Sequence, residues 1–107
     1  MKSNLDQQVL SILEKIELEM KNIGFWKDNP PKFQAKNYLD SPSFELWLQC
    51  VFIPNARNAA ATGKYPKGSQ VGLMAMRQYD YHSCVEEALS LVQLLRKFDS
   101  LIEGASA

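Results

Sequence analysis

The residues of this chain whose side chains are most able to bind a metal or to act in catalysis are Asp80, His82 and Cys84. They occupy alternate positions of one short segment. Carboxylate, imidazole and thiolate groups all bind metals, and a Cys–His pair can also act as a nucleophile and its base. However, zinc sites need three or four protein ligands, His82 is the only histidine, and the other cysteine, Cys50, lies in an apolar segment. Residues two positions apart also do not easily reach nucleophile–base geometry. We therefore expect no metal site, with His82 in a polar turn at a helix start and Cys84 in the core.

Other catalytic signatures are absent from the sequence. It contains no Gly-rich phosphate loop, no GxSxG motif and no HExxH motif. The carboxylates Glu14, Glu17, Glu86 and Glu87 fall on polar faces of predicted helices, where charged side chains are usually only solvated. The sequence thus predicts a protein that is not an enzyme and needs no cofactor.

The overall charge is balanced, with 12 Lys and Arg against 12 Asp and Glu, which excludes a basic footprint over the whole domain. The longest uncharged run, Leu46 to Ala56, is 11 residues long, whereas a membrane-spanning helix needs about 20. The N-terminal residues enter a charged amphipathic pattern without a signal-peptide core. We expect a cytoplasmic protein with no membrane association and free cysteines.

One charge asymmetry remains, because no acidic residue lies between Glu45 and Asp80. Exposed cations in this interval can attract an acidic partner surface or phosphates, although ordinary loop solubility is the simpler explanation for them. Four cations are few beside the six to ten phosphate contacts of a committed nucleic-acid binder, so direct nucleic-acid binding is expected to be weak or absent. With Trp26, which lies in a loop, the candidate partner-binding residues are Trp26, Arg57, Lys64, Tyr65, Lys67 and Arg77.

Two long amphipathic helices are predicted at the ends of the chain. Residues 5–23 carry apolar side chains at intervals of three and four, and Gly24 can end this helix. A helix from about residues 81–83 to Glu103 follows the same pattern, with a capping box beginning at Ser83 and with Gly104 as its terminator. The apolar face of this last helix is wide, which indicates either a central position or contact with a second subunit in a homodimer.

Between these helices we expect a crossing loop over residues 25–41, ordered by its aromatic and proline residues. A second long helix then begins with Ser41 as N-cap, kinks at Pro54 and ends at Gly63, and a short third helix follows Ser69. Gln49 lies on the narrow polar side of the second helix, where it is either exposed or bonded to the crossing loop. The predicted fold is an all-α four-helix bundle of three long helices and one short helix, forming a single domain over residues 1–107.

The kink at Pro54 suggests a second type of site. Large apolar side chains around a kinked helix can line a pocket for a small ligand, although Trp47 is more simply explained as a core residue. The candidate pocket residues are Trp47, Phe52, Pro54, Met74 and Met76.

Four short motifs are similar to those of the YqcC-like family of small bacterial proteins. They are Phe25-Trp26 followed by Pro30, Asp40-Ser41, Trp47-Leu48-Gln49 and Phe52-Ile53-Pro54. The resemblance implies a four-helix bundle of unknown molecular function, often encoded beside a tRNA pseudouridine synthase of the uridine-65 class. Two hypotheses follow: a non-enzymatic interaction module that is an accessory to such a synthase, or a small-ligand binding bundle with its pocket near Pro54.

Overall fold

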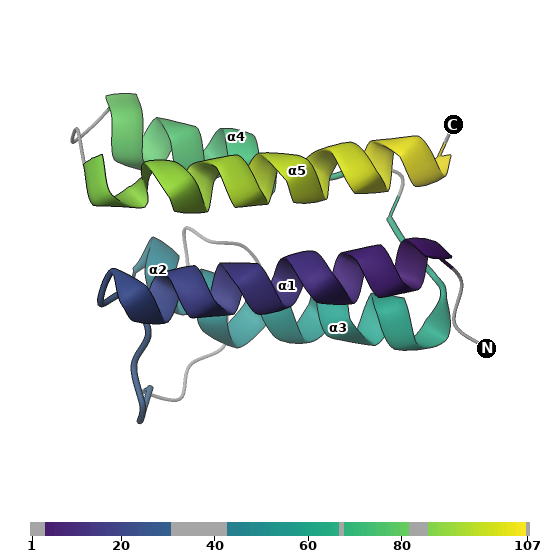
Figure 1. The fold of residues 1–107 in the computed structure, drawn as a ribbon, viewed down its shortest axis with the longest axis horizontal. Helices are drawn as coiled ribbons and strands as arrows, with labels where there is room; N and C mark the ends of the chain where they lie inside the picture. The colour runs from purple at the N-terminus through teal and green to yellow at the C-terminus, as the bar shows by residue number, and fades with distance from the viewer. Residues whose placement is uncertain (1–3, 31–42, 67, 82–85, 107) are drawn as a thin grey trace.

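The structure is a computed structural model that describes residues 4–30, 43–66, 68–81 and 86–106. These residues form four helical rods and no strand, so the predicted all-α four-helix fold is confirmed (Figure 1). The first rod is α1 (Asn4–Asn22), and the second joins α2 (Phe44–Trp47), the π-helical turn η2 (Leu48–Phe52) and α3 (Ile53–Thr62). The third joins α4 (Val71–Met76) and a second π-helical turn, η3 (Arg77–Tyr81); the fourth joins the 3₁₀ turn η4 (Glu86–Ala88) and α5 (Leu89–Ser106).

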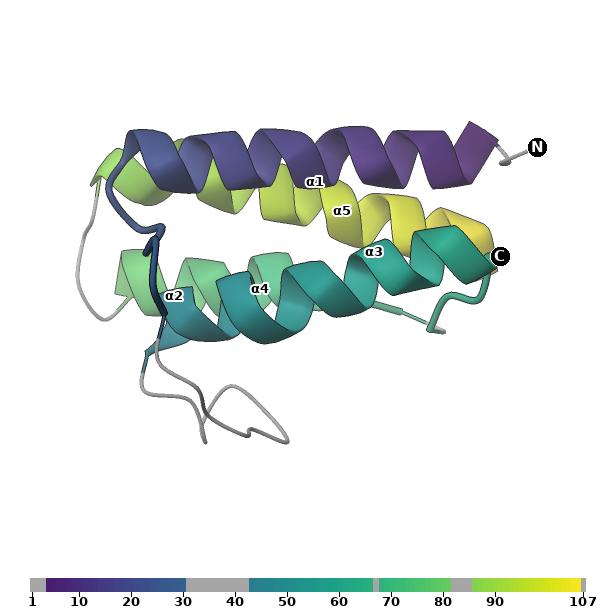
Figure 2. The same ribbon diagram turned by 90° about the horizontal axis from the view of Figure 1, so that it is seen from below.

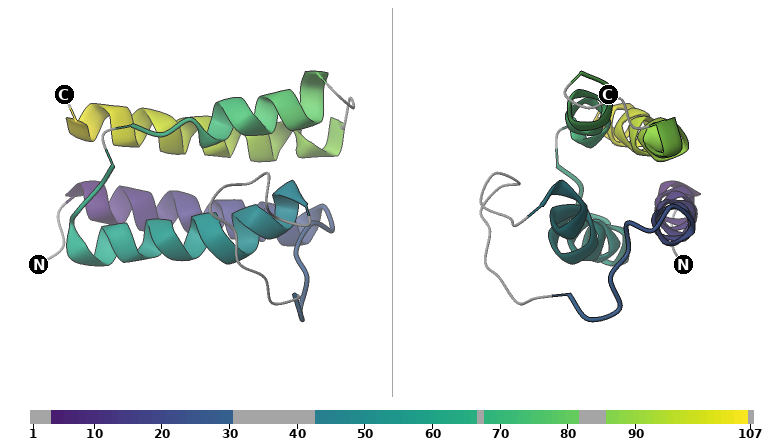
Figure 3. Two further views of the ribbon diagram at one scale, coloured as in Figure 1. Left: turned by 180° about the vertical axis from the view of Figure 1, so that it is seen from behind. Right: turned by 90° about the vertical axis from the view of Figure 1, so that its left-hand side faces the viewer.

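Successive rods run in opposite directions and occupy the corners of a square in the end-on view (Figure 3, right). α5 packs against α1 and α4, and α1 also packs against α3. The second and third rods face each other across the remaining side of the square, where their backbones approach each other less closely (Figures 2 and 3). Phe44 of the second rod and Tyr79 of the third still meet edge to face across this side, with ring centroids 5.8 Å apart.

The core lies on the predicted stripes of α1 and α5. Their largest fully buried side chains are Val9, Leu13, Ile16 and Met20 from α1, and Leu91, Leu95 and Ile102 from α5. α5 packs against both α1 and α4, which buries Leu91, Leu95 and Ile102 within one chain, while Leu94 and Leu101 on its wide apolar face stay partly exposed. Gly24 adopts a left-handed conformation (φ +82°) directly after α1, as predicted for its terminator.

Two predicted helix ends are wrong. The N-cap of the second rod is Ser43, whose extended backbone lets its hydroxyl accept a 3.1 Å hydrogen bond from the Leu46 N–H; Ser41 itself lies outside the described residues. α5 continues through Gly104 to Ser106, because an exposed helical glycine costs only about 1 kcal/mol relative to alanine and does not require a stop. The predicted capping box at Ser83 also lies outside the described residues.

Pro54 is accommodated by the π-helical turn that precedes it. The Ile53 N–H donates to the Leu48 carbonyl, five residues earlier, in place of the four-residue spacing of an α-helix. This wider turn relieves the crowding that a proline ring otherwise creates against the preceding turn. α3 then continues to Gly63, whose left-handed conformation (φ +72°) ends it as predicted.

Gln49 anchors the beginning of the crossing loop. Its side-chain oxygen accepts from the Lys27 N–H (3.0 Å), and its side-chain nitrogen donates to the Lys27 carbonyl (2.7 Å). The sequence allowed Gln49 to be either exposed or bonded to the crossing loop. In the structure its side chain is buried and is hydrogen-bonded to this loop. The rest of the predicted crossing loop, from residue 31 on, lies outside the described residues.

The third rod is held against α5 by two local features. A Cβ at Gly72 would lie 2.7 Å from the backbone of Arg96, so only glycine allows this close approach. Asp99 of α5 accepts hydrogen bonds from the N–H groups of Val71 (3.1 Å) and Gly72 (2.8 Å), and from the Ser69 hydroxyl (2.6 Å). Asp99 thus caps the beginning of α4 from a neighbouring helix.

Candidate functional site

An apolar groove of about 200 Å³ lies between the second rod, the linker that follows Gly63, and α5. The residues that line it come from three separate parts of the chain. They are Trp47, Phe52, Asn55, Ala56, Ala59, Tyr65, Pro66, Gly68, Ser69, Phe98 and Ile102.

The groove exists because the third rod is short. α4 begins only at Val71, so an extended linker, and no helix, runs beside the C-terminal half of α5 (Figure 3, left). Small residues at Ala56, Ala59 and Gly68 leave the remaining space. The space in the groove therefore results from the late start of α4 and from the small side chains that line it.

Phe52 contacts two other aromatic rings of the groove, those of Trp47 and Phe98. Trp47 and Phe52 stack with their centroids 5.9 Å apart and their planes at 25°. Phe52 meets Phe98 of α5 edge to face at 4.9 Å and 79°. In a regular α-helix, residues five apart point about 140° away from each other, so the π-helical turn is what brings Trp47 and Phe52 to one face.

Tyr65 fixes the linker wall of the groove. Its hydroxyl donates a hydrogen bond to the buried carboxylate of Asp6 on α1. Burial raises the pKa of Tyr65, and the hydrogen bond to Asp6 raises it further, so the phenol is neutral at physiological pH. The sequence placed Tyr65 among the partner-binding residues; the structure places it in the lining of the groove.

No charged side chain lines the groove among the described residues. Asn55 is exposed and supplies an amide. The hydroxyl of Ser69 is already bonded to Asp99, and that of Tyr65 to Asp6. The groove is therefore suited to an uncharged group of mainly apolar character.

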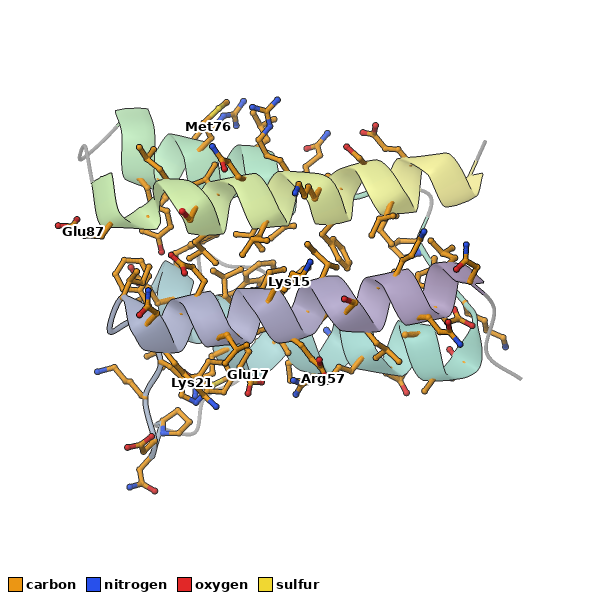
Figure 4. The ribbon with its side chains drawn as sticks, viewed as in Figure 1. Lys15, Glu17, Lys21, Arg57, Met76 and Glu87 are labelled. Carbon is orange, nitrogen blue, oxygen red and sulfur yellow. The ribbon has the colours of Figure 1, made fainter. Side chains whose placement is uncertain are left out.

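Two of the predicted partner-binding residues, Trp26 and Arg57, are linked only through Lys21 and Glu17. Figure 4 shows Glu17, Lys21 and Arg57 side by side where α1 faces α3. Glu17 pairs with Arg57 at 2.6 Å and with Lys21 at 3.0 Å. The Lys21 ammonium lies 5.3 Å from the ring centroid of Trp26. Hydrogen bonds from Arg57, and then from Lys21, lower the pKa of Glu17. This network links the loop to the bundle, and its ion pairs are largely exposed.

The other predicted cations are separated. Lys64 follows the C-terminal end of α3, while Arg77 begins η3 at the opposite end of the bundle (Figure 1). Lys67 lies outside the described residues. Within the described part of the chain, the basic interval therefore does not form one continuous surface.

Of the five predicted pocket residues, Trp47 and Phe52 line the apolar groove. Pro54 is exposed on the second rod. Met76 lies in a separate polar groove between α4 and α5 (Figure 4), and Met74 packs against the core. Sequence reasoning missed the contributions of Asn55, Tyr65 and Phe98, although the shortness of the third helix was a signal that part of α5 stays uncovered.

The described residues hold no cluster of three or more potential metal ligands. His82, Cys84 and the side chain of Asp80 lie outside them. Cys50 is a half-buried free thiol whose pKa is raised by burial. A raised pKa makes this thiol a weak nucleophile at neutral pH.

Comparison with known proteins gives one match. A family model described as "tRNA pseudouridine synthase C" matches residues 8–101. No curated protein and no solved structure matches the chain. Within the described residues, no helix combines the length and apolar character needed to cross a bilayer.

Proposed function

The chain belongs to the family described as tRNA pseudouridine synthase C, the YqcC-like family that its motifs resemble, and from this premise we propose that it is a non-enzymatic interaction module. Its partner in this proposal is a tRNA pseudouridine synthase, and the two proteins act together in the cytoplasm. The observation that carries the proposal is the open apolar groove between the second rod and α5.

The groove has the features of a protein-binding hot spot. Aromatic residues dominate such sites, and the energy of a protein interface is concentrated in a few apolar pockets. Phe52 already contacts both Trp47 and Phe98, so the positions of these rings are set before any partner binds. A preorganised surface of this kind loses little side-chain entropy on binding.

The choice of a binding role over a catalytic role is supported by the side chains at hand. Among the residues that the structure describes, none that lines the groove has a charged side chain that could act as a general acid or base. The chain also has only one histidine, and the pKa of Cys50 is raised. These observations favour an accessory role beside a separate enzyme.

Affinity purification from the source cell, with the synthase quantified by mass spectrometry, tests this proposal. Asn55→Arg introduces a long cation at the groove, whereas Asn58→Arg makes the same change at an exposed position of α3 outside the groove lining. We expect the synthase to be enriched with the wild type and Asn58→Arg, and reduced about tenfold with Asn55→Arg. That loss corresponds to about 1.4 kcal/mol of binding free energy.

Two outcomes would contradict the proposal in different ways. If the synthase is not enriched with any version of the protein, it is not the partner. If Asn55→Arg and Asn58→Arg recover it equally, the groove is not the contact surface. Trp26→Ala combined with Lys64→Glu tests the surface that the sequence had favoured.

A second candidate function is a small-ligand binding bundle, which is favoured by Trp47 and Phe52 lining one cavity beside the Pro54 turn. Native mass spectrometry of the protein purified from its source cell tests this alternative. A bound compound retained at constant stoichiometry would support it, and a protein carrying no added mass would count against it.

A further inference from the structure

The size of the groove restricts what it can hold. Its volume is about 200 Å³, whereas pockets for complete small-molecule ligands span roughly 300–1,000 Å³. An apolar protein cavity of about 150 Å³ is large enough to bind benzene. The space inside the groove therefore matches one ring with a small substituent.

The lining specifies the chemistry of that ring. Four aromatic side chains contribute to the walls, from Trp47, Phe52, Tyr65 and Phe98. Aromatic rings attract another ring through offset stacking or edge-to-face contact. A charged ring would lose its hydration without gaining an ionic partner from the described residues, because none of those that line the groove is charged. Asn55 can still bond the polar tip of a tyrosine or a tryptophan at the groove.

The small volume also favours a side chain over a free compound. A free ligand of about nine heavy atoms must obtain all of its binding free energy from those few atoms. A ring attached to a larger protein avoids this limit, since the surrounding interface adds binding energy and restricts its motion. The groove thus fits the anchor residue of a protein partner.

We infer that the groove binds one uncharged aromatic side chain of the partner protein, held between the Trp47–Phe52 pair, Tyr65 and Phe98. This inference rests on the proposed function for the identity of the partner. The ring-binding property belongs to this chain alone and can be tested without the partner.

The test is a titration of the isotopically labelled full chain with indole, followed by amide and indole N–H NMR resonances. The two tryptophans provide an internal comparison, because Trp47 lines the groove and Trp26 does not. We expect the Trp47 resonance to shift saturably in about the millimolar range while the Trp26 resonance stays in place; Trp26→Phe assigns the two signals. Benzoate and benzylammonium, which are charged rings of similar size, are expected to bind at least about tenfold more weakly.

Ala59→Leu fills the groove, and Ala61→Leu places the same side chain on the exposed side of α3. We expect at least a tenfold weaker response to indole with Ala59→Leu and a response within about twofold of the wild type with Ala61→Leu. If Ala59→Leu does not fold, Gly68→Leu is the second groove variant, because Gly68 also lines the groove and a Cβ there meets no atom within 4 Å that would prevent folding.

Three results would overturn the inference: no saturable shift of Trp47, equal binding of charged and uncharged rings, or an unchanged response with both groove-filling variants. A free aromatic compound retained through purification would overturn the assignment to a side chain. Failure of the synthase to co-purify is a separate result, since indole binding with no recovered synthase contradicts only the identity of the partner.

Discussion

The contact between Gly72 and Arg96 determines how closely α4 packs against α5. From the sequence, a glycine inside the short third helix was an unfavourable feature, because glycine weakens an isolated helix. In the structure its missing side chain is what allows the two backbones to approach. Propensity could not indicate this requirement, because it depends on a neighbour 24 positions away along the chain.

Gly72→Ala is expected to destabilise the protein by about 1–3 kcal/mol, since the new methyl group would meet the Arg96 backbone and force α4 outward. Gly104→Ala is the matched control, because that position lies in α5 with no atom near the added Cβ. We expect the control to stabilise the protein by about 0.5–1 kcal/mol. Urea unfolding measures both changes, and equal effects at the two positions would contradict the close packing.

The burial of Tyr79 predicts how the free energy of unfolding depends on pH in the alkaline range. Tyr79 is 3% exposed, its ring contacts Phe25 and Phe44, and the carboxylate of Glu45 lies near its hydroxyl. Burial raises the pKa of Tyr79 above its ordinary value of about 10, and the negative charge of Glu45 adds to the rise. The unfolded chain therefore loses this proton at a lower pH than the folded chain does.

The stability contributed by Tyr79 is complete below about pH 10 and is lost as pH rises towards the folded pKa. The loss approaches about 1.4 kcal/mol per pH unit for one such group. We expect Tyr79→Phe to show a shallower fall in the free energy of unfolding between pH 9.5 and 11, measured by urea titration. Parallel curves for the variant and the wild type would show that Tyr79 does not titrate differently in the folded state.

At the scale of single elements, some features of the second rod could be predicted from its sequence and others could not. The fixed φ of proline predicts a helix distortion just before Pro54, with helix on both sides of it. The ability of glycine to adopt a left-handed conformation predicts the helix end at Gly63. The form of the disturbance, a π-helical turn, could not be predicted, because several local distortions relieve the same crowding. The contact between Trp47 and Phe52 depends on that choice, so the sequence could name both residues without predicting their stacking.

The third rod depends on a cap supplied by another helix. Asp99→Ala removes the acceptor of the Val71 and Gly72 N–H groups, and we expect a loss of about 1–3 kcal/mol in the free energy of unfolding. Asp99→Asn keeps one acceptor oxygen and is expected to cost less, while Ser100→Ala, at the exposed next position, should change stability by less than about 0.5 kcal/mol.

Asp99 also gives a prediction about how the stability of the protein changes with pH in the mildly acidic range. Burial raises the pKa of Asp99 more than its hydrogen bonds from Ser69, Gly72 and Val71 lower it. Its contribution to stability is therefore greatest below the unfolded pKa of about 3.9 and is lost as pH rises through the folded pKa. We expect the stability of Asp99→Asn relative to the wild type to increase from pH 3.5 to pH 7, as measured by urea unfolding. A constant difference between them over this range would contradict the shift.

For the whole molecule, apolar periodicity predicted the four rods and most of the core, because burying one stripe per helix leaves few other arrangements. The location of the groove was not available from that pattern. It depends on where the short third rod begins relative to α5, and on a linker held by Tyr65 and Asp6. The cations of residues 57–77 were grouped only because they lie in one stretch of sequence without acidic residues. The fold places two of them, Lys64 and Arg77, at opposite ends of the bundle.

Hydrogen–deuterium exchange of the chain with and without purified synthase tests the central claim, that the groove is the docking surface, most directly. We expect binding to slow exchange in peptides covering residues 52–66 and 95–103, which line the groove from α3, the linker and α5. Peptides covering residues 8–19 of α1 should exchange at the same rate in both samples. Protection confined to α1, or no protection in the presence of saturating synthase, would contradict the account.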